Sequence, residues 1–253
     1  MVQRKELVDY LQCFLNVDDF KDYCPNGLQV EGCSEINHIV AGVTASQALI
    51  DQAVEQNADA ILVHHGYFWR GESEPVVGIK QKRIKTLLQA DINLLAYHLP
   101  LDAHPQLGNN AQLARQLGIE DAVSRKHNGV NDLLWEASLK QSMNAVELGQ
   151  LLQLRLERSA LWLPSTSNQR IKRLVWCSGG AQSYIEMAAA MGADAYISGE
   201  VSEQTTHLAK ELDIHYFAAG HHATERYGVQ ALAAHLAEKF DISYQFIDIE
   251  NPV

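Results

Sequence analysis

Two related stretches of this sequence decide the fold. Residues 39–47 read Ile39-Val-Ala-Gly-Val-Thr-Ala-Ser-Gln47, and residues 174–182 read Leu174-Val-Trp-Cys-Ser-Gly-Gly-Ala-Gln182. The same offset, which takes 39 to 174, also takes Asn57-Ala-Asp-Ala60 to Gly192-Ala-Asp-Ala195 without a gap. Strand, helix and capping positions that stay in step over two stretches indicate an internal duplication.

A third pair of stretches extends the repeat. Asp91-Ile-Asn-Leu-Leu-Ala-Tyr-His98 resembles Asp213-Ile-His-Tyr-Phe-Ala-Ala-Gly-His221, which is one residue longer. Around these stretches, short apolar runs alternate with helical patterns, as in βαβ units with a parallel or mixed sheet. The expected strands are 38–43, 60–63, 92–97 and 133–139, and the expected helices are 4–17, 79–89 and 144–157.

The duplication predicts an α/β protein with two similar α/β domains and a metal-bearing cleft between them. We expect the first domain to contain residues 1–125, joined by the C-terminal strand at about 240–253. Residues 126–239 are expected to form the second domain. The 253-residue length allows one large domain or two modest ones.

Composition narrows the classes of partner. The net charge of −11 disfavours nucleic acid, because an acidic chain repels the phosphate backbone. The four cysteines include no C-x-x-C pair, which argues against a thiolate zinc site and a disulfide framework. No apolar run approaches the ~18 residues that a membrane span needs, and residues 1–7 lack the apolar core of a signal peptide. We therefore expect a cytoplasmic protein.

The ends of the expected strands carry metal-ligand side chains. In the first half, His64 and His65 follow the strand 60–63, and His98 ends the next strand, four residues before Asp102. Ligands bind open α/β sheets at the carboxyl ends of their strands. Adjacent histidines on a strand point in opposite directions, so they suit two ions better than one.

The second half repeats the pattern of a histidine followed by an acid. His221 and Glu225 are four residues apart at the start of an expected helix, where they share one face. Either motif alone is common in proteins that bind no metal, and His98 is plausible as a ligand or as a hydrogen-bonding partner of a bound group. Taken together, the set suits a pair of Zn, Mn, Fe or Co ions. It consists of three histidines and two carboxylates: His64, His65, His221, Asp102 and Glu225.

An aromatic segment follows the paired histidines. Tyr67, Trp69 and Arg70 could stack a flat ring and hold a phosphate, which makes them candidate substrate-binding residues. The alternative, which the sequence favours, is an aromatic cluster that closes the core or an oligomer contact. The phosphate-binding P-loop, the Rossmann glycine motif and the α/β-hydrolase elbow are all missing from the sequence.

The sequence resembles the NIF-three-like family, also labelled GTP cyclohydrolase I type 2 homologues. The resemblance covers essentially the whole chain and rests on four motifs: Asn26-Gly-Leu-Gln-Val-Glu-Gly32, Ala60-Ile-Leu-Val-His-His-Gly-Tyr-Phe68, His98-Leu-Pro-Leu-Asp-Ala-His104 and Gly220-His-His-Ala-Thr-Glu225. It implies two α/β domains, a dinuclear metal centre and a toroidal homohexamer. The implied ligands are His64, His65, Asp102, His221 and Glu225, with Glu225 bridging.

Two functions fit these observations. The first is a metal-dependent hydrolase with two divalent ions per subunit, acting on a small molecule as in the ring opening of GTP; His98 would be its proton shuttle. The alternative is a non-catalytic metal-binding or regulatory hexameric ring. The sequence favours the hydrolase, because ligands around a cleft leave coordination positions open.

Overall fold

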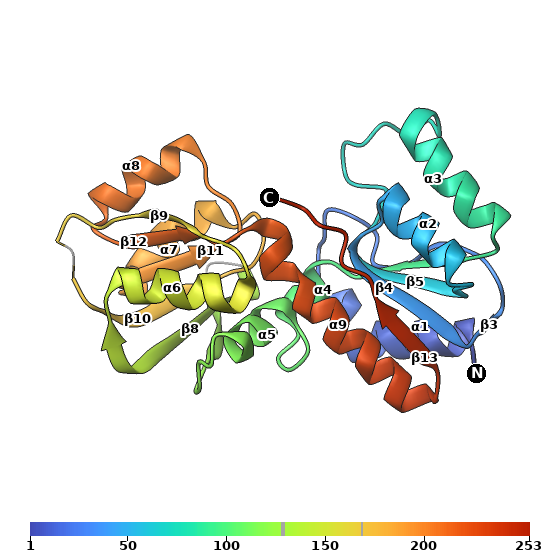
Figure 1. The fold of residues 1–253 in the computed structure, drawn as a ribbon, viewed down its shortest axis with the longest axis horizontal. Helices are drawn as coiled ribbons and strands as arrows, with labels where there is room; N and C mark the ends of the chain where they lie inside the picture. The colour runs from blue at the N-terminus through green and yellow to red at the C-terminus, as the bar shows by residue number, and fades with distance from the viewer. Residues whose placement is uncertain (128–129, 168) are drawn as a thin grey trace. The chain divides into compact units, whose positions relative to one another are not determined.

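The computed structural model describes residues 1–127, 130–167 and 169–253, which form an α/β protein of two compact units (Figure 1). The first unit contains Met1–Leu101 and Gly228–Glu250, and the second contains Asp102–Tyr227 and Asn251–Val253. Among the described residues, no helix has the length and apolar character to cross a membrane.

These bounds differ from the expected domains at both internal boundaries, and Asn251–Val253 belongs to the second unit although about 240–253 was expected in the first. The first boundary falls at 101/102 instead of 125/126, because helix α5 (Asn109–Gln116) contributes Leu113 to the core of the second unit. The last helix, α9 (His221–Phe240), passes from one unit to the other at Gly228. Its later part packs on the first unit, where His235 stacks on Phe14 with ring centroids 4.5 Å apart.

A five-stranded sheet forms the centre of the first unit, in the order β13-β4-β5-β6-β2. The first four strands are parallel, and β2 is antiparallel to β6. The strands are β2 (Gly27–Val30), β4 (His38–Thr44), β5 (Ala60–His65), β6 (Asn93–Ala96) and β13 (Ser243–Phe246), and a separate ribbon pairs β1 (Val2–Gln3) with β3 (Glu35–Ile36).

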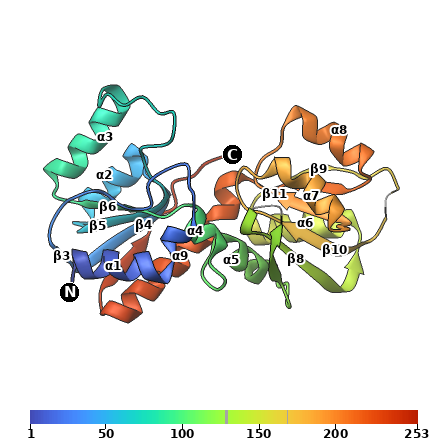
Figure 2. The same ribbon diagram turned by 180° about the vertical axis from the view of Figure 1, so that it is seen from behind.

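Helices cover both faces of this sheet (Figure 2). On one face, α2 (Gln47–Glu55) and α3 (Gly78–Gln89) bury Leu49 and Leu87 against Val40 and Ile61 of the strands. On the other face lie α1 (Arg4–Phe14) and the later part of α9. A strand buried on both faces reads as a continuous apolar run, which explains the sequence of β4 and β5.

The second unit contains a six-stranded sheet in the order β7-β8-β10-β11-β12-β9. Its central strands β10, β11 and β12 are parallel, and β8 and β9 flank them antiparallel. The strands are β7 (Val123–His127), β8 (Val130–Met143), β9 (Leu161–Leu163), β10 (Ile171–Trp176), β11 (Ala195–Ser198) and β12 (His215–Ala218).

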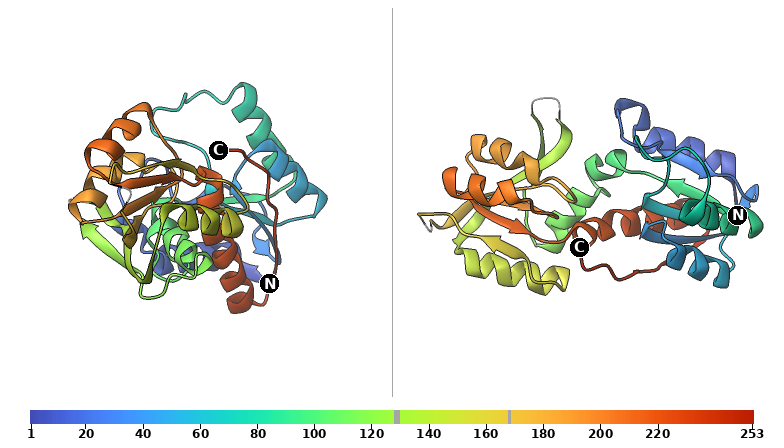
Figure 3. Two further views of the ribbon diagram at one scale, coloured as in Figure 1. Left: turned by 60° about the vertical axis from the view of Figure 1, so that its left-hand side comes forward. Right: turned by 90° about the horizontal axis from the view of Figure 1, so that it is seen from above.

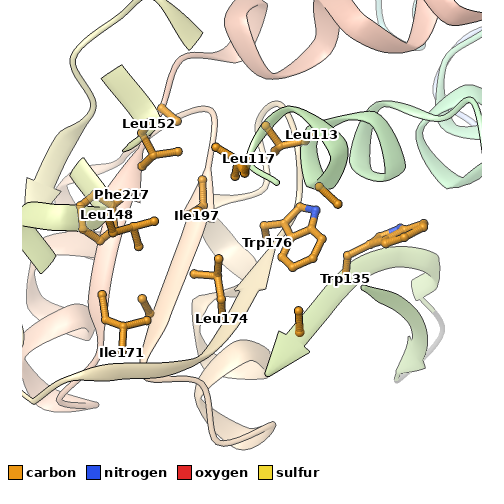
Figure 4. Close-up of a cluster of buried hydrophobic side chains, with 14 of the residues drawn as sticks. Leu113, Leu117, Trp135, Leu148, Leu152, Ile171, Leu174, Trp176, Ile197 and Phe217 are labelled. Atoms are coloured by element: carbon orange, nitrogen blue, oxygen red, sulfur yellow. The ribbon is translucent and has the colours of Figure 1, made fainter. Parts of the chain in front are cut away.

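The core of this unit lies between the sheet and helices α5 and α6 (Ala145–Leu156) (Figure 4). Leu113 and Leu148 face Trp176 and Phe217 of the sheet, and all four side chains are buried. The opposite face is covered by α7 (Ile185–Ala190) and α8 (Glu203–Glu211) (Figure 3). Helix α6 begins with the capping box of Asn144 and Glu147, within one residue of the expected 144–157.

Strands β4 and β5 pair in the same register as strands β10 and β11, which supports the internal duplication. Ile39 pairs with Ala60 in the first sheet, and Leu174 pairs with Ala195 in the second, at the 135-residue offset expected from the sequence. A half-buried aspartate also occurs at the same position of both halves. Asp59 accepts hydrogen bonds from two successive backbone N–H groups at the start of β4, and Asp194 does the same at β10.

Candidate metal centre

Two histidines end the central strand of the first unit. Strand β5 continues through His64 and His65, two residues beyond the expected end at Val63, so His64 is fully buried and His65 is half-buried. The expectation that the two rings point apart is wrong, because their centroids lie only 4.5 Å apart. The simple alternation of a strand does not hold for long side chains at its end.

His98 joins these two histidines from the end of the neighbouring strand. Its ring centroid lies 5.1 Å from that of His64 and 5.7 Å from that of His65. One ring nitrogen from each of the three residues lies within 4.8 Å of the other two. The first unit therefore gathers three imidazoles at the carboxyl edge of its sheet, where the sequence predicted donors.

The tautomer of His64 follows from its hydrogen bond. Nδ1 lies 2.9 Å from the carbonyl oxygen of Tyr97, and a carbonyl oxygen can only accept, so Nδ1 carries the hydrogen. In the neutral ring, Nε2 then has the lone pair that a metal ion needs. Metal-bound histidines commonly donate their other N–H to a backbone carbonyl in this way.

His98 is held by a carboxylate that the sequence did not single out. Asp22 Oδ1 lies 2.7 Å from His98 Nδ1, and Asp22 Oδ2 accepts from the backbone N–H of Leu99. Burial raises the pKa of Asp22, but hydrogen bonds from His98, Asn26 and Leu99 outweigh it and lower the pKa to about 2. Asp22 is therefore ionised at neutral pH and orients the His98 ring.

The aromatic segment divides into core and surface. Tyr67 is buried, and its hydroxyl donates to the carbonyl of Ala45, so the structure places it in the core. Trp69 stands edge-on to His98 with centroids 4.9 Å apart. Arg70 is exposed, and its guanidinium lies over the Tyr23 ring. Of the three candidate substrate residues, Trp69 is in contact with the histidine cluster.

In the second unit, Asp102 is held by two side-chain donors. It lies on the short helix α4 (Leu99–Ala103) and is buried. Its Oδ1 accepts from Asn109 Nδ2 at 2.8 Å and from Ser178 Oγ at 3.2 Å. Donors of this kind favour the charged carboxylate and fix its direction.

His221 and Glu225 form the second cluster of this unit. They lie one turn apart at the start of α9, and His221 Nε2 is 3.0 Å from Glu225 Oε2. The loop after β10 contacts both side chains: a Cβ on Gly179 would lie 2.0 Å from Glu225 Oε1 and 3.2 Å from His221 Nε2. Only glycine lets the backbone come this close.

Glu200 is the partner on the other side of the His221 ring, and the sequence reasoning missed it. Its Oε1 lies 2.8 Å from His221 Nδ1. Burial lowers the pKa of His221, but Glu225 and Glu200 outweigh it and raise the pKa to about 9. The pair of carboxylates thus stabilises positive charge at this ring. The internal repeat could have pointed to Glu200, because the 135-residue offset pairs His65 with Glu200.

The repeat also corrects the alignment of His98 with His221. Tyr97 donates its backbone N–H to Val63, and Ala219 donates its own to Ser198, so these two positions correspond. His98 therefore corresponds to Gly220, and His221 comes one residue later as the first residue of α9. The two halves do not supply equivalent histidines.

The donor set fits divalent transition-metal ions. The first unit offers imidazole nitrogens, with a defined tautomer at His64, and the second offers buried carboxylates beside a histidine. Imidazole with carboxylate and without thiolate suits Zn, Mn, Fe or Co. These side chains could hold metal, as the sequence expectation requires.

Comparisons with known proteins show what the chain is similar to. A protein of Pseudomonas aeruginosa is 53% identical over 246 residues, covers 97% of both chains and is named GTP cyclohydrolase 1 type 2 homolog. The solved structure of the protein ybgI, described as of unknown function, is 50% identical with a TM-score of 0.94 over 100% of both chains. A protein of Thermus thermophilus is 34% identical with a TM-score of 0.89, again over 100% of both chains.

The family profile of Duf34/NIF3 (NGG1p interacting factor 3) matches residues 2–252. That match spans both units and every candidate ligand. The resemblance found in the sequence is confirmed, and the chain belongs to the Duf34/NIF3 (NGG1p interacting factor 3) family.

Proposed function

We propose that this protein is a metal-dependent hydrolase whose five ligands hold two divalent ions. The ligands are His64, His65, Asp102, His221 and Glu225, with Glu225 shared by both ions. The observation that carries the proposal is the gathering of His64, His65 and His98 at one sheet edge, with the His64 tautomer that leaves Nε2 for a metal. The buried carboxylates of the second unit supply the compensating negative charge.

Two ions at these residues would supply Lewis acidity and lower the pKa of water toward neutrality. The protein's own part is to move and hold protons. Asp22 accepts the Nδ1 hydrogen of His98, which leaves Nε2 of the neutral ring as a base. His98 would then accept a proton from water and return it to a leaving group.

The substrate class is the finer part of the proposal. Trp69 lies beside His98 and could stack a flat ring, and the exposed guanidinium of Arg70 could pair with a phosphate. Tyr67 has no part in it, since its hydroxyl is committed to Ala45 in the core. A purine nucleotide opened by hydrolysis, as the relatives' name suggests, fits these contacts.

Metal content and turnover measured on the same preparations test the proposal. We expect two ions per chain in the wild type, fewer in Glu225→Ala, and metal-dependent turnover of a nucleotide or phosphoester that Asp102→Ala abolishes. His98→Ala should keep the metal and lose about 10²- to 10⁴-fold in rate, the usual contribution of a general acid or base. His207→Ala is the matched control, because His207 is exposed and pairs with Glu203 at 3.3 Å.

The outcomes separate the two functions left by the sequence. One ion at saturation, or full retention by Glu225→Ala, would contradict the bridging role. Two ions without turnover of any nucleotide, phosphoester or amide in a broad panel with Mn, Zn, Fe and Co would favour the non-catalytic metal-binding or regulatory protein.

A further inference from the structure

Glu200 lies next to the candidate metal centre, where it contacts the ring of His221. It lies two residues beyond the end of β11, the central parallel strand of the second sheet. The 135-residue offset places it where the first unit has His65. The two sheets thus carry different chemistry at one structural position: an imidazole in one and a carboxylate in the other.

Three hydrogen bonds hold Glu200 in place. Its Oε1 accepts from His221 Nδ1 at 2.8 Å, and its Oε2 accepts from Gln182 Nε2 at 3.3 Å. Its backbone carbonyl accepts from the hydroxyl of Tyr216, whose side chain belongs to the buried strand β12. Both carboxylate oxygens are engaged within the unit, which favours a positioning residue over a direct metal ligand.

The direction of the hydrogen bond decides what Glu200 does to His221. Glu200 lies on the Nδ1 side of the ring, and the opposite nitrogen, Nε2, faces Glu225 Oε2 at 3.0 Å. A metal ion at Nε2 would take the place of the proton there, while Nδ1 keeps its hydrogen for Glu200. Histidines that bind metal through Nε2 are commonly oriented by a carboxylate on Nδ1, and that carboxylate also makes the ring a better donor.

We propose that Glu200 is the positioning residue that fixes His221 with Nε2 toward its metal ion. The inference rests on the proposed function, since it requires that His221 is a ligand. It adds a residue that contacts no ion and no substrate, and acts through the ring of His221.

The experiment measures metal affinity directly, so it needs no substrate. Metal-loaded wild type, Glu200→Gln and Glu200→Ala are dialysed against graded chelator–Zn²⁺ and chelator–Mn²⁺ buffers, and bound metal is determined. We expect about a 10- to 100-fold weaker affinity for the ion at His221 in Glu200→Ala, the usual effect of losing such a partner. Glu200→Gln should lose less, because the amide oxygen can still accept from Nδ1.

Glu203→Gln is the matched control. It removes a carboxylate three residues away that pairs with the exposed His207, so it should leave both affinities unchanged. The ¹⁵N shifts of the His221 ring in metal-loaded protein give a second readout: Nδ1 should stay protonated in the wild type and lose its strong hydrogen bond in Glu200→Ala. Circular dichroism confirms that each variant is folded.

The possible failures are distinguishable. If the wild type binds no ion, the proposed function falls and this inference with it. If the wild type binds two ions and Glu200→Ala binds them as tightly as Glu203→Gln does, the role of Glu200 alone is overturned. If only Glu200→Ala is misfolded, Glu200→Gln decides: a weakened ion supports positioning, and an affinity equal to that of the control contradicts it.

Discussion

At the scale of the residue, the clearest constraint on the candidate site is Gly179. Its φ of +66° is costly for other residues, and a Cβ there would lie 2.0 Å from Glu225 Oε1. We expect Gly179→Ala to displace the Glu225 carboxylate, to lower metal content and to destabilise the fold by about 1–3 kcal/mol. Metal analysis and urea unfolding of the same preparation measure both effects.

Gly192 provides the control for backbone strain. Its φ is +75°, but a Cβ there would meet only the Arg173 side chain at 3.7 Å, an ordinary contact. Gly192→Ala should therefore show the strain without the loss of metal. Equal metal content in the two variants would show that Gly179 does not control the position of Glu225.

At the scale of the element, Glu136 ties three neighbouring strands together. It lies on β8, and its buried carboxylate contacts Arg125 of β7 and Arg173 of β10 at 2.6 Å each. Burial raises the pKa of Glu136, but the hydrogen bonds from the two arginines outweigh it and lower the pKa below its ordinary value. The charged form is therefore the one that stabilises the sheet.

The sign of this shift gives a pH prediction. Because the pKa is lower in the folded state, the stabilisation is complete above the ordinary glutamate pKa of ~4.3 and is lost as the pH falls below it. Glu136→Gln should cost about 1–3 kcal/mol at pH 7, as for a lost hydrogen bond to a charged group, and progressively less toward pH 3. Urea unfolding at several pH values measures the difference.

Glu120 is the comparison at this edge of the sheet. It pairs with Lys140 of β8, but both side chains are about 70% exposed, so Glu120→Gln should change stability little at any pH. A Glu136→Gln cost that is the same at pH 7 and pH 3 would show that packing, and not charge, is what Glu136 contributes.

At the scale of the whole molecule, we propose the toroidal homohexamer that the family resemblance implies. Beside helix α3, Val76 and Leu88 are exposed and line one hollow together with Ile84, an apolar surface of the kind that marks contacts between protein chains. Light scattering at micromolar concentration should give six times the chain mass of 28.2 kDa. A mass of one chain would refute the assembly.

Much of the fold could be predicted because local patterns of apolar residues determine it. Continuous apolar runs predicted β4 and β5, the helical pattern over 144–157 predicted α6, and the 135-residue offset predicted the common register of the two sheets. Strand ends carry His64, His65 and His98 because the carboxyl edge of a parallel sheet is where its chain turns out of the core.

Tertiary structure alone decided the partners of these residues. Asp22 and His98 are 76 positions apart in the chain, and Glu200 and His221 are 21 apart, so no helical or strand period links them. The convergence of His64 with His65, and the burial of Tyr67 against Ala45, likewise depend on how side chains pack at a strand end. Local periodicity determines which face a residue occupies, whereas hydrogen-bond partners depend on which loops the topology brings to the same edge.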